Sequence, residues 1–248
     1  MVIFMENHLP ENNVLRTSTI RHTGVSRSPF SSLNLSYGVG DDALSVSTNR
    51  NTLKNTLSIP HLLSARQVHG DNIYIHEKSL SDDLEVDNCD ALMTDIPGVG
   101  LMIQQADCQA ITLYDPVHSA IAAIHSGWKG SVLNIIAKTI RVMQQQYNSK
   151  PADILAYISP SLGPCCSEFV NHATELPSSF LAFQTKENYF DFWQISAMQL
   201  KDAGLAEPNI EIAGLCTSCS SDYFSYRRAC RTGDGQTGRC ATLIVLQQ

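Results

Sequence analysis

The chain has 248 residues, of which 43% are hydrophobic and 17% charged, and its formal net charge is -7. This composition predicts a globular protein with a large apolar core rather than a disordered chain. The negative net charge and the absence of a run rich in Lys and Arg argue against a nucleic-acid partner. No window reaches the roughly 20 apolar residues that a membrane-spanning helix needs, which argues against a membrane partner.

The cysteine count and the first residues predict the compartment. The start of the chain has only a short apolar run and contains Glu6, a pattern that does not fit a signal peptide. Eight cysteines in such a chain are better interpreted as reduced thiols and ligands than as a disulfide framework. We therefore expect a cytoplasmic protein.

The first part of the chain is predicted to combine strands, polar loops and one helix. Alternating or apolar runs predict strands at residues 14–20 and 72–76, a loop rich in Ser, Gly and Asn at 21–42, a surface helix at 45–57 and an acidic surface loop at 79–88. His76 and His118 are expected to face solvent.

The second part is predicted to alternate more regularly between strands and helices. We expect a strand at residues 101–103, a hairpin of 111–114 and 120–124, strands at 154–158, 210–212 and 240–246, and helices after residue 130, around Phe169 and at 195–203. This irregular alternation favours a mixed sheet. No linker or repeat divides the chain, so residues 1–248 are predicted to form a single domain.

A thiol and two imidazoles stand where predicted strands give way to turns. Cys108 and His125 each follow an apolar run, and His69 precedes a glycine at the edge of another. Thiolate and neutral imidazole both suit zinc, and three protein ligands leave one coordination position for water or substrate. The spacing lacks the short paired intervals of zinc fingers. On residue types alone the stronger interpretation is therefore that Cys108 is a small buried residue, that His125 caps the turn and that His69 is hydrogen-bonded in the core.

Several motifs occur in order along nearly the whole chain: QVHG at residues 67–70, CDALMT at 89–94, ADCQ at 106–109, HSGWKG at 125–130, GPCC at 163–166 and TGR at 237–239. Together they resemble the YfiH-like family, also called the laccase-domain or multicopper polyphenol oxidase family. The resemblance implies a mixed α/β (α+β) layered sandwich, with mixed sheets flanked by helices. In that family the matching His, Cys and His bind zinc, and these positions are His69, Cys108 and His125.

The resemblance also implies an activity. Family members are associated with purine nucleoside phosphorylase activity on adenosine, inosine, guanosine and methylthioadenosine, and with adenosine deaminase activity. Zinc in an open site lowers the pKa of bound water to about 7, and the resulting hydroxide could attack C6 of adenine. Asp107, the neighbour of Cys108, is the candidate general acid or base, although an adjacent residue can also point away from the site.

Phosphorolysis also needs cations near the phosphate. Arg27, Arg66 and Lys129 are the candidate phosphate contacts, and Arg50 is a further guanidinium in the same part of the sequence. The alternative for each is a solvated surface charge or a structural ion pair. The partners expected from the resemblance are therefore purine nucleosides and phosphate.

Other functions remain open at this stage. Copper oxidation is the alternative that the older family name suggests, but a laccase needs several coppers and paired H-x-H motifs, and the eight histidines include no such pair. Links within the family also allow a peptidoglycan-precursor editing hydrolase, an amidase acting on a UDP-muramyl dipeptide. A further alternative is a binding protein with a structural metal. The sequence leaves the preferred nucleoside and the oligomeric state undecided.

The remaining cysteines have no clear partners in the sequence. Cys216 and Cys219 form a C-x-x-C pair, but Cys230 and Cys240 are not spaced as a second pair, and no thioredoxin-like strand and helix surround the first. Cys165 and Cys166 are interpreted as packing residues.

Overall fold

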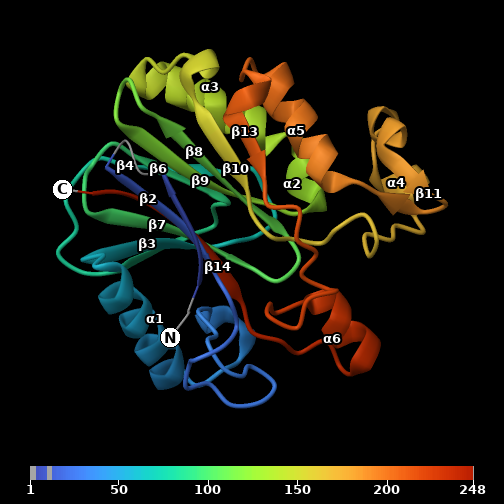
Figure 1. Cartoon of the computed structure of the whole chain (residues 1–248), viewed down its shortest axis with the longest axis horizontal. Coiled ribbons are helices and arrows are strands. Elements are labelled where there is room, and N and C mark those ends of the chain that lie inside the picture. Colours follow the sequence, from blue (N-terminus) through green and yellow to red (C-terminus); the bar gives the residue numbers. More distant parts are fainter. Residues whose placement is uncertain (1–3, 10–12, 248) are drawn as a thin grey trace.

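A computed structural model describes residues 4–9 and 13–247, and this part of the chain forms two six-stranded mixed sheets (Figure 1). The first sheet has the order β1 (Phe4–Leu9), β2 (Val14–Thr19), β14 (Cys240–Leu246), β7 (Val99–Gln105), β3 (His61–Arg66) and β5 (Leu84–Asp87). The second has the order β13 (Ile210–Ile212), β10 (Leu155–Ile158), β8 (Gln109–Asp115), β9 (Ala120–Ser126), β6 (Ala91–Thr94) and β4 (Ile73–His76).

Helices cover the outer face of each sheet. α1 (Ala43–Leu57) packs on the first sheet, whereas α3 (Ile135–Tyr147) and α5 (Phe192–Asp202) pack on the second, on the opposite side of the molecule in Figure 1. The shorter elements are α2 (Trp128–Leu133), α4 (His172–Glu175), α6 (Tyr226–Thr232), the ribbon of β11 (Gln184–Lys186) and β12 (Tyr189–Phe190), and 3-10 helices at Tyr37–Val39, Pro151–Asp153, Ser178–Phe183 and Glu207–Asn209. The layered architecture of mixed sheets and flanking helices is therefore confirmed.

The alternation of side chains explains why two sheets stack. In β7, Leu101 and Ile103 point into the core between the sheets, and Met102 points to the core beneath α1. In β8, Ala110 joins the core between the sheets, and its neighbour Ile111 packs under α3 and α5. Because successive residues of a strand face opposite sides, a strand that is apolar throughout must be covered on both faces.

Two predictions of local structure were wrong, and the start of one predicted helix was shifted. The acidic segment at residues 79–88 contains β5, which pairs in parallel with β3, because charged side chains are tolerated on an edge strand. Phe169 lies outside any helix and packs against other aromatic rings. The helix expected after residue 130 begins at Trp128, and Asn134, with a φ of 53°, ends α2 and caps α3.

Two further expectations concern exposure. His76 was expected to face solvent but is buried, with 7% of its surface exposed, whereas His118 is exposed, as expected. Within the described residues, no helix combines the length and the apolar character needed to cross a membrane.

Candidate active site

The candidate site lies at the end of the sandwich where the chain crosses between the sheets. The turn from β7 to β8 makes one crossing and carries Cys108, and the loop from β3 to β4 makes another and carries His69. His125 lies near the end of β9, which pairs with the start of β8 through the register of Ala110 with His125. Two sheet crossings and one strand end thus bring three distant segments together.

The three predicted metal ligands meet at this end. Their ligand atoms all lie within 4.8 Å of one another, and Cys108 Sγ is 3.7 Å from Nε2 of His69. The imidazole rings of His69 and His125 lie edge to face, with centroids 4.7 Å apart. One thiolate and two imidazoles at these separations fit a single zinc ion held by three protein ligands.

Asp90 orients two of these ligands. Its side chain is completely buried at the start of β6, and its Oδ1 accepts hydrogen bonds from Nδ1 of His125 at 2.8 Å and from the backbone N–H of His69 at 2.9 Å. Oδ2 accepts from the N–H groups of Val68 at 3.2 Å and Gly70 at 2.8 Å. Since Nδ1 of His125 donates to the carboxylate, Nε2 is free to act as a metal ligand.

Asp90 stands within the CDALMT motif, which by itself does not indicate the role of this carboxylate. The signal that it offered was a carboxylate directly before a fully apolar strand, because a buried Asp requires hydrogen-bonding partners.

The protonation states of the ligands depend on one another. Burial would raise the pKa of the Cys108 thiol, but the positive charge of His125 and hydrogen bonds from both histidines lower it to about 6. Burial would lower the pKa of His125, but Cys108 and Asp90 raise it to about 9. Burial likewise opposes ionisation of Asp90, yet its bonds to His125 and the backbone lower its pKa. The site therefore favours a thiolate at neutral pH, the form that binds metal.

The backbone around the ligands is tightly constrained. His69 and Asp107 adopt positive φ values of 59° and 87°, which are rare for residues other than glycine and often occur at functional sites. Gly127 closes the site, because a Cβ there would lie 2.9 Å from Cδ2 of His69 and 3.1 Å from Sγ of Cys108. A glycine at this position allows the chain to approach both ligands.

Two cavities adjoin the ligand cluster, and His69 and Cys108 line both. The first, of about 650 Å³, is lined by charged and polar side chains that include Arg66, Gln104 and Arg239. The second, of about 390 Å³, is lined by aromatic rings from Trp128, Phe169, Phe192 and Tyr226. The ligand cluster therefore faces one cavity that contains two arginines and one that is rich in aromatic rings.

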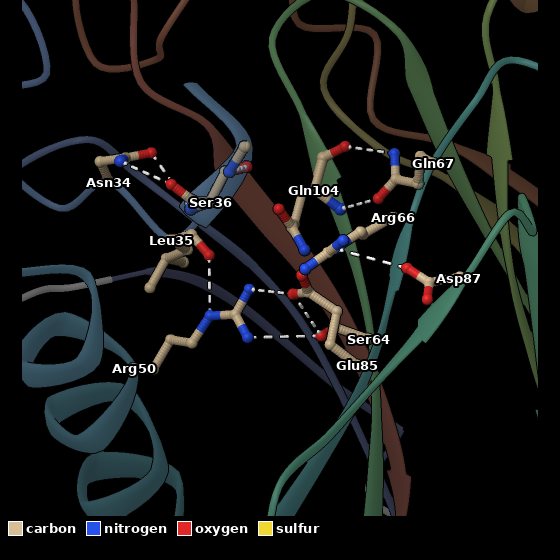
Figure 2. Close-up of polar contacts among 11 residues, drawn as sticks. Asn34, Leu35, Ser36, Arg50, Ser64, Arg66, Gln67, Glu85, Asp87 and Gln104 are labelled. Atoms are coloured by element: carbon tan, nitrogen blue, oxygen red, sulfur yellow. Dashed lines mark hydrogen bonds and ion pairs between the residues drawn. The ribbon is translucent and has the colours of Figure 1, made fainter. Parts of the chain in front are cut away.

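The predicted cations occupy different places. Arg66 lines the first cavity, with 74% of its side chain exposed, and pairs with Asp87 at 3.4 Å and Glu85 at 3.7 Å (Figure 2). Arg27 and Lys129 are exposed and line neither cavity, and Lys129 lies over the Trp128 ring. The phosphate-contact role of these three residues stays a prediction.

Arg50 has a structural role. It reaches from α1 to bond the carbonyl of Leu35, the hydroxyl of Ser64 and the carboxylate of Glu85, as Figure 2 shows. Its guanidinium also lies over the ring of Tyr37, with Cζ 4.4 Å from the ring centroid. Arg50 therefore supports one wall of the first cavity and is only 4% exposed.

Arg239 is a cation that the sequence analysis did not single out. It lines the first cavity, and its guanidinium donates to the carbonyls of Thr237 at 2.8 Å and Gly238 at 3.1 Å. Burial lowers its pKa, while the nearby Cys108 and Asp107 raise it. The only sequence signal was its place in the TGR motif.

Asp107 lines the second cavity. Its Oδ1 accepts from the hydroxyl of Thr217 at 2.7 Å, and its Oδ2 accepts from the backbone N–H of Arg227 at 2.6 Å. These two bonds hold the carboxylate in one orientation beside Cys108.

The fold and the sequence motifs correspond to a described family. Residues 16–247 match the family model described as "Multi-copper polyphenol oxidoreductase laccase", so the chain belongs to this family. The structure is similar to the crystal structure of YlmD from Geobacillus stearothermophilus, with a TM-score of 0.87, 28% identity and full coverage of both chains. It is also similar to the Bacillus licheniformis protein YfiH, with a TM-score of 0.84, 31% identity and coverage of 94% of this chain and 93% of that one.

Relatives in sequence carry enzyme names. A protein of Bacteroides thetaiotaomicron named purine nucleoside phosphorylase is 31% identical over 88% of this chain and 87% of its own length. The Geobacillus stearothermophilus protein named purine nucleoside phosphorylase YlmD is 31% identical over 91% of this chain and 88% of its own length. The family and the names of these relatives support a purine nucleoside enzyme of the YfiH type.

Proposed function

We propose that this chain is a zinc-dependent enzyme that phosphorolyses adenosine, inosine, guanosine and methylthioadenosine and hydrolytically deaminates adenosine. The observation that carries the proposal is the convergence of His69, Cys108 and His125 between two cavities. Their donor set suits zinc, and Asp90 supplies the carboxylate that commonly orients a metal-bound imidazole. When bound, zinc supplies Lewis-acid chemistry to substrate or water at this position.

The two cavities divide the substrate between them in this proposal. The aromatic rings of Trp128, Phe169 and Phe192 offer stacking surfaces for a purine base in the second cavity. The guanidinium of Arg239 in the first cavity offers charge-assisted hydrogen bonds to phosphate, and Arg66 can add to them at the exposed edge. The bond to be broken then lies next to Cys108, which lines both cavities.

Asp107 carries the proton in both reactions. In phosphorolysis it takes a proton from the attacking phosphate and passes it to a ring nitrogen of the departing purine, and in deamination it takes a proton from the attacking water and passes it to the departing amine. Thr217 and the backbone of Arg227 hold its carboxylate in the wall of the second cavity, where the base is placed.

In the test, the zinc-loaded protein is incubated separately with inosine and phosphate, with adenosine without phosphate, and with a UDP-muramyl dipeptide. We expect phosphate-dependent release of hypoxanthine and phosphate-independent release of ammonia. Cleavage of the muramyl conjugate alone would replace the proposal with the editing hydrolase, and absence of any purine or ammonia release would refute it.

Ligand variants link the activity to the site. His69→Ala, Cys108→Ala and His125→Ala are each expected to abolish turnover and the binding of zinc at this site. His118→Ala is the matched control, because His118 also bonds a buried carboxylate, that of Asp115 at 2.8 Å, but at the opposite end of β8. Full zinc content and turnover in any one of the three ligand variants would remove that residue from the assignment.

Metal analysis distinguishes the proposed zinc enzyme from a copper oxidase, the activity that the family description names. The described residues contain one cluster with two histidines and one made only of cysteines, whereas a multicopper oxidase needs several histidine-rich sites. Protein purified without chelators is expected to contain zinc and to lack the visible band of a copper–thiolate centre.

A further inference from the structure

Four thiols meet beside the candidate active site. Cys165 and Cys166 lie on the turn after β10, and Cys216 and Cys219 lie on the loop after β13. Sγ of Cys219 is 3.5 Å from Sγ of both Cys165 and Cys166, and all four sulfur atoms lie within 4.8 Å of one another. All eight cysteines of the chain are free, and Cys165 is exposed, so its interpretation as a packing residue was wrong.

The strand pairing explains why two distant pairs converge. β10 and β13 are parallel neighbours, with Ile158 in register with Ile212. Parallel strands end at the same edge of a sheet, so the segments that follow them lie side by side. Backbone hydrogen bonds continue this pairing beyond the strands, from the N–H of Ser161 to Leu215 and from the N–H of Thr217 back to Ser161.

The spacing of the sulfur atoms suits a tetrahedral ion. A zinc–sulfur bond is about 2.3 Å long, which places the sulfurs of a regular tetrahedron about 3.8 Å apart. The closest sulfur pairs lie at 3.5 Å and the widest within 4.8 Å, so small rotations of the side chains would complete the tetrahedron. Four thiolates are a donor set that soft-ligand metals such as zinc prefer.

Two groups beside the cluster complement the negative charge of bound thiolates. The backbone N–H of Gly163 donates to Sγ of Cys216 at 3.3 Å, and the guanidinium of Arg231 lies 3.9 Å from Sγ of Cys166. An N–H donor and a cation both offset the negative charge that four thiolates leave around a divalent ion. Gly163 also permits the close approach, because a Cβ there would lie 3.0 Å from Cβ of Cys216.

We propose that Cys165, Cys166, Cys216 and Cys219 bind a second zinc ion, separate from the one held by the histidines and Cys108. Four protein ligands close the coordination sphere, which makes this site structural. The ion joins the segment after β10 to the segment after β13.

The second site supports the first through one loop. Thr217 lies between two of the cysteines, and its hydroxyl holds the carboxylate of Asp107 at 2.7 Å, directly beside Cys108. The guanidinium of Arg228 binds the carbonyls of Thr217 at 2.8 Å and Ser220 at 2.8 Å, which fixes the same loop from the side of α6. Zinc in the thiol cluster would therefore hold Asp107 in position without touching substrate.

The decisive measurement is zinc per chain by mass spectrometry of the metal, in protein purified without chelators. We expect about two zinc ions in the wild type and about one in a Cys165→Ser, Cys219→Ser double variant. A His69→Ala variant should also keep about one, and Cys230→Ser, which removes an exposed thiol outside the cluster, should keep about two. Retention of two ions by the double variant, or of none by His69→Ala, would overturn the proposal.

A second measurement needs no variant. X-ray absorption of the wild-type protein should give about 2.5 sulfur ligands per zinc, because one site supplies four sulfurs and the other supplies one. About one sulfur per zinc would leave only the active-site ion and refute the second site. Fewer than eight thiols after denaturation without reductant would also overturn it, because the cluster would then hold a disulfide instead of a metal.

Discussion

Asp90→Asn is the sharpest test of how the site is built. Each oxygen of the Asp90 carboxylate accepts two hydrogen bonds, Oδ1 from His69 and His125 and Oδ2 from Val68 and Gly70. Asparagine keeps one acceptor oxygen and replaces the other by an NH2 group. In either orientation of the amide, two N–H groups that had bonded the buried carboxylate then face a donor.

The structure allows the cost to be worked out. An unsatisfied buried donor costs about 1–3 kcal/mol, so two of them are expected to lower the free energy of unfolding by about 2–6 kcal/mol. Loss of a carboxylate that orients a ligand histidine typically weakens metal binding by about 10- to 100-fold. Zinc affinity should therefore fall by about 1.4–2.7 kcal/mol, in addition to the loss of stability.

Asp115→Asn is the matched control. Asp115 is also completely buried, and it accepts from the N–H groups of Val117 and His118 and from Nδ1 of His118. It lies at the far end of β8, about 20 Å of extended chain from Cys108. This variant should lose stability to a similar extent and keep the zinc affinity of the wild type.

The assay is competition for zinc against a chromogenic chelator, with thermal unfolding of the metal-free proteins measured in parallel. If Asp90→Asn and Asp115→Asn bind zinc equally well, the carboxylate of Asp90 supports the fold alone, and its role in orienting His125 is refuted.

The other predictions concern the ligands and the anion contact. Gly127→Ala should weaken zinc binding by at least about tenfold, because the new Cβ would meet His69 at 2.9 Å and Cys108 at 3.1 Å; unchanged metal content would contradict this. Metal-free protein holds Cys108 as a thiolate above a pH of about 6 and His125 as an imidazolium below about 9. In the Cys165→Ser, Cys219→Ser variant, which keeps only the first site, zinc loading at about pH 7.5 should therefore release about one proton from His125. Calorimetry in buffers of different ionisation enthalpy measures the number of protons released. The affinity for zinc should fall further below pH 6, because the Cys108 thiol must then also lose a proton before it can bind the metal. Arg239→Gln should raise the KM for phosphate by about tenfold while phosphate-independent ammonia release changes little; equal losses in both reactions would rule out a phosphate contact.

The candidate ligands could be proposed from the sequence because their signals are local. Strand-like runs ending at Cys108 and His125 indicate side chains presented at strand ends, and the motifs around them resemble the YfiH-like family. The buried strands were equally visible, since a continuous apolar run such as the one at residues 101–103 requires a sheet covered on both faces.

The role of Arg50 and the strand at residues 84–87 depend on which distant segments come into contact. Those contacts form only when the two sheets pack together. Arg50 is one of several arginines in the sequence, and its contacts with Glu85 and Leu35 make it structural. Residues 84–87 look like an acidic loop until β3 provides the partner for an edge strand.

The sequence by itself therefore determined the kinds of side chain available for metal binding and the faces of the strands that carry them. The tertiary structure alone decided that Asp90 lies behind His125 and that Cys166 and Cys219 lie 3.5 Å apart across two loops. The physical reason is that periodicity reports the face on which a side chain lies, whereas the approach of distant loops follows from strand order and from where the chain crosses between the sheets.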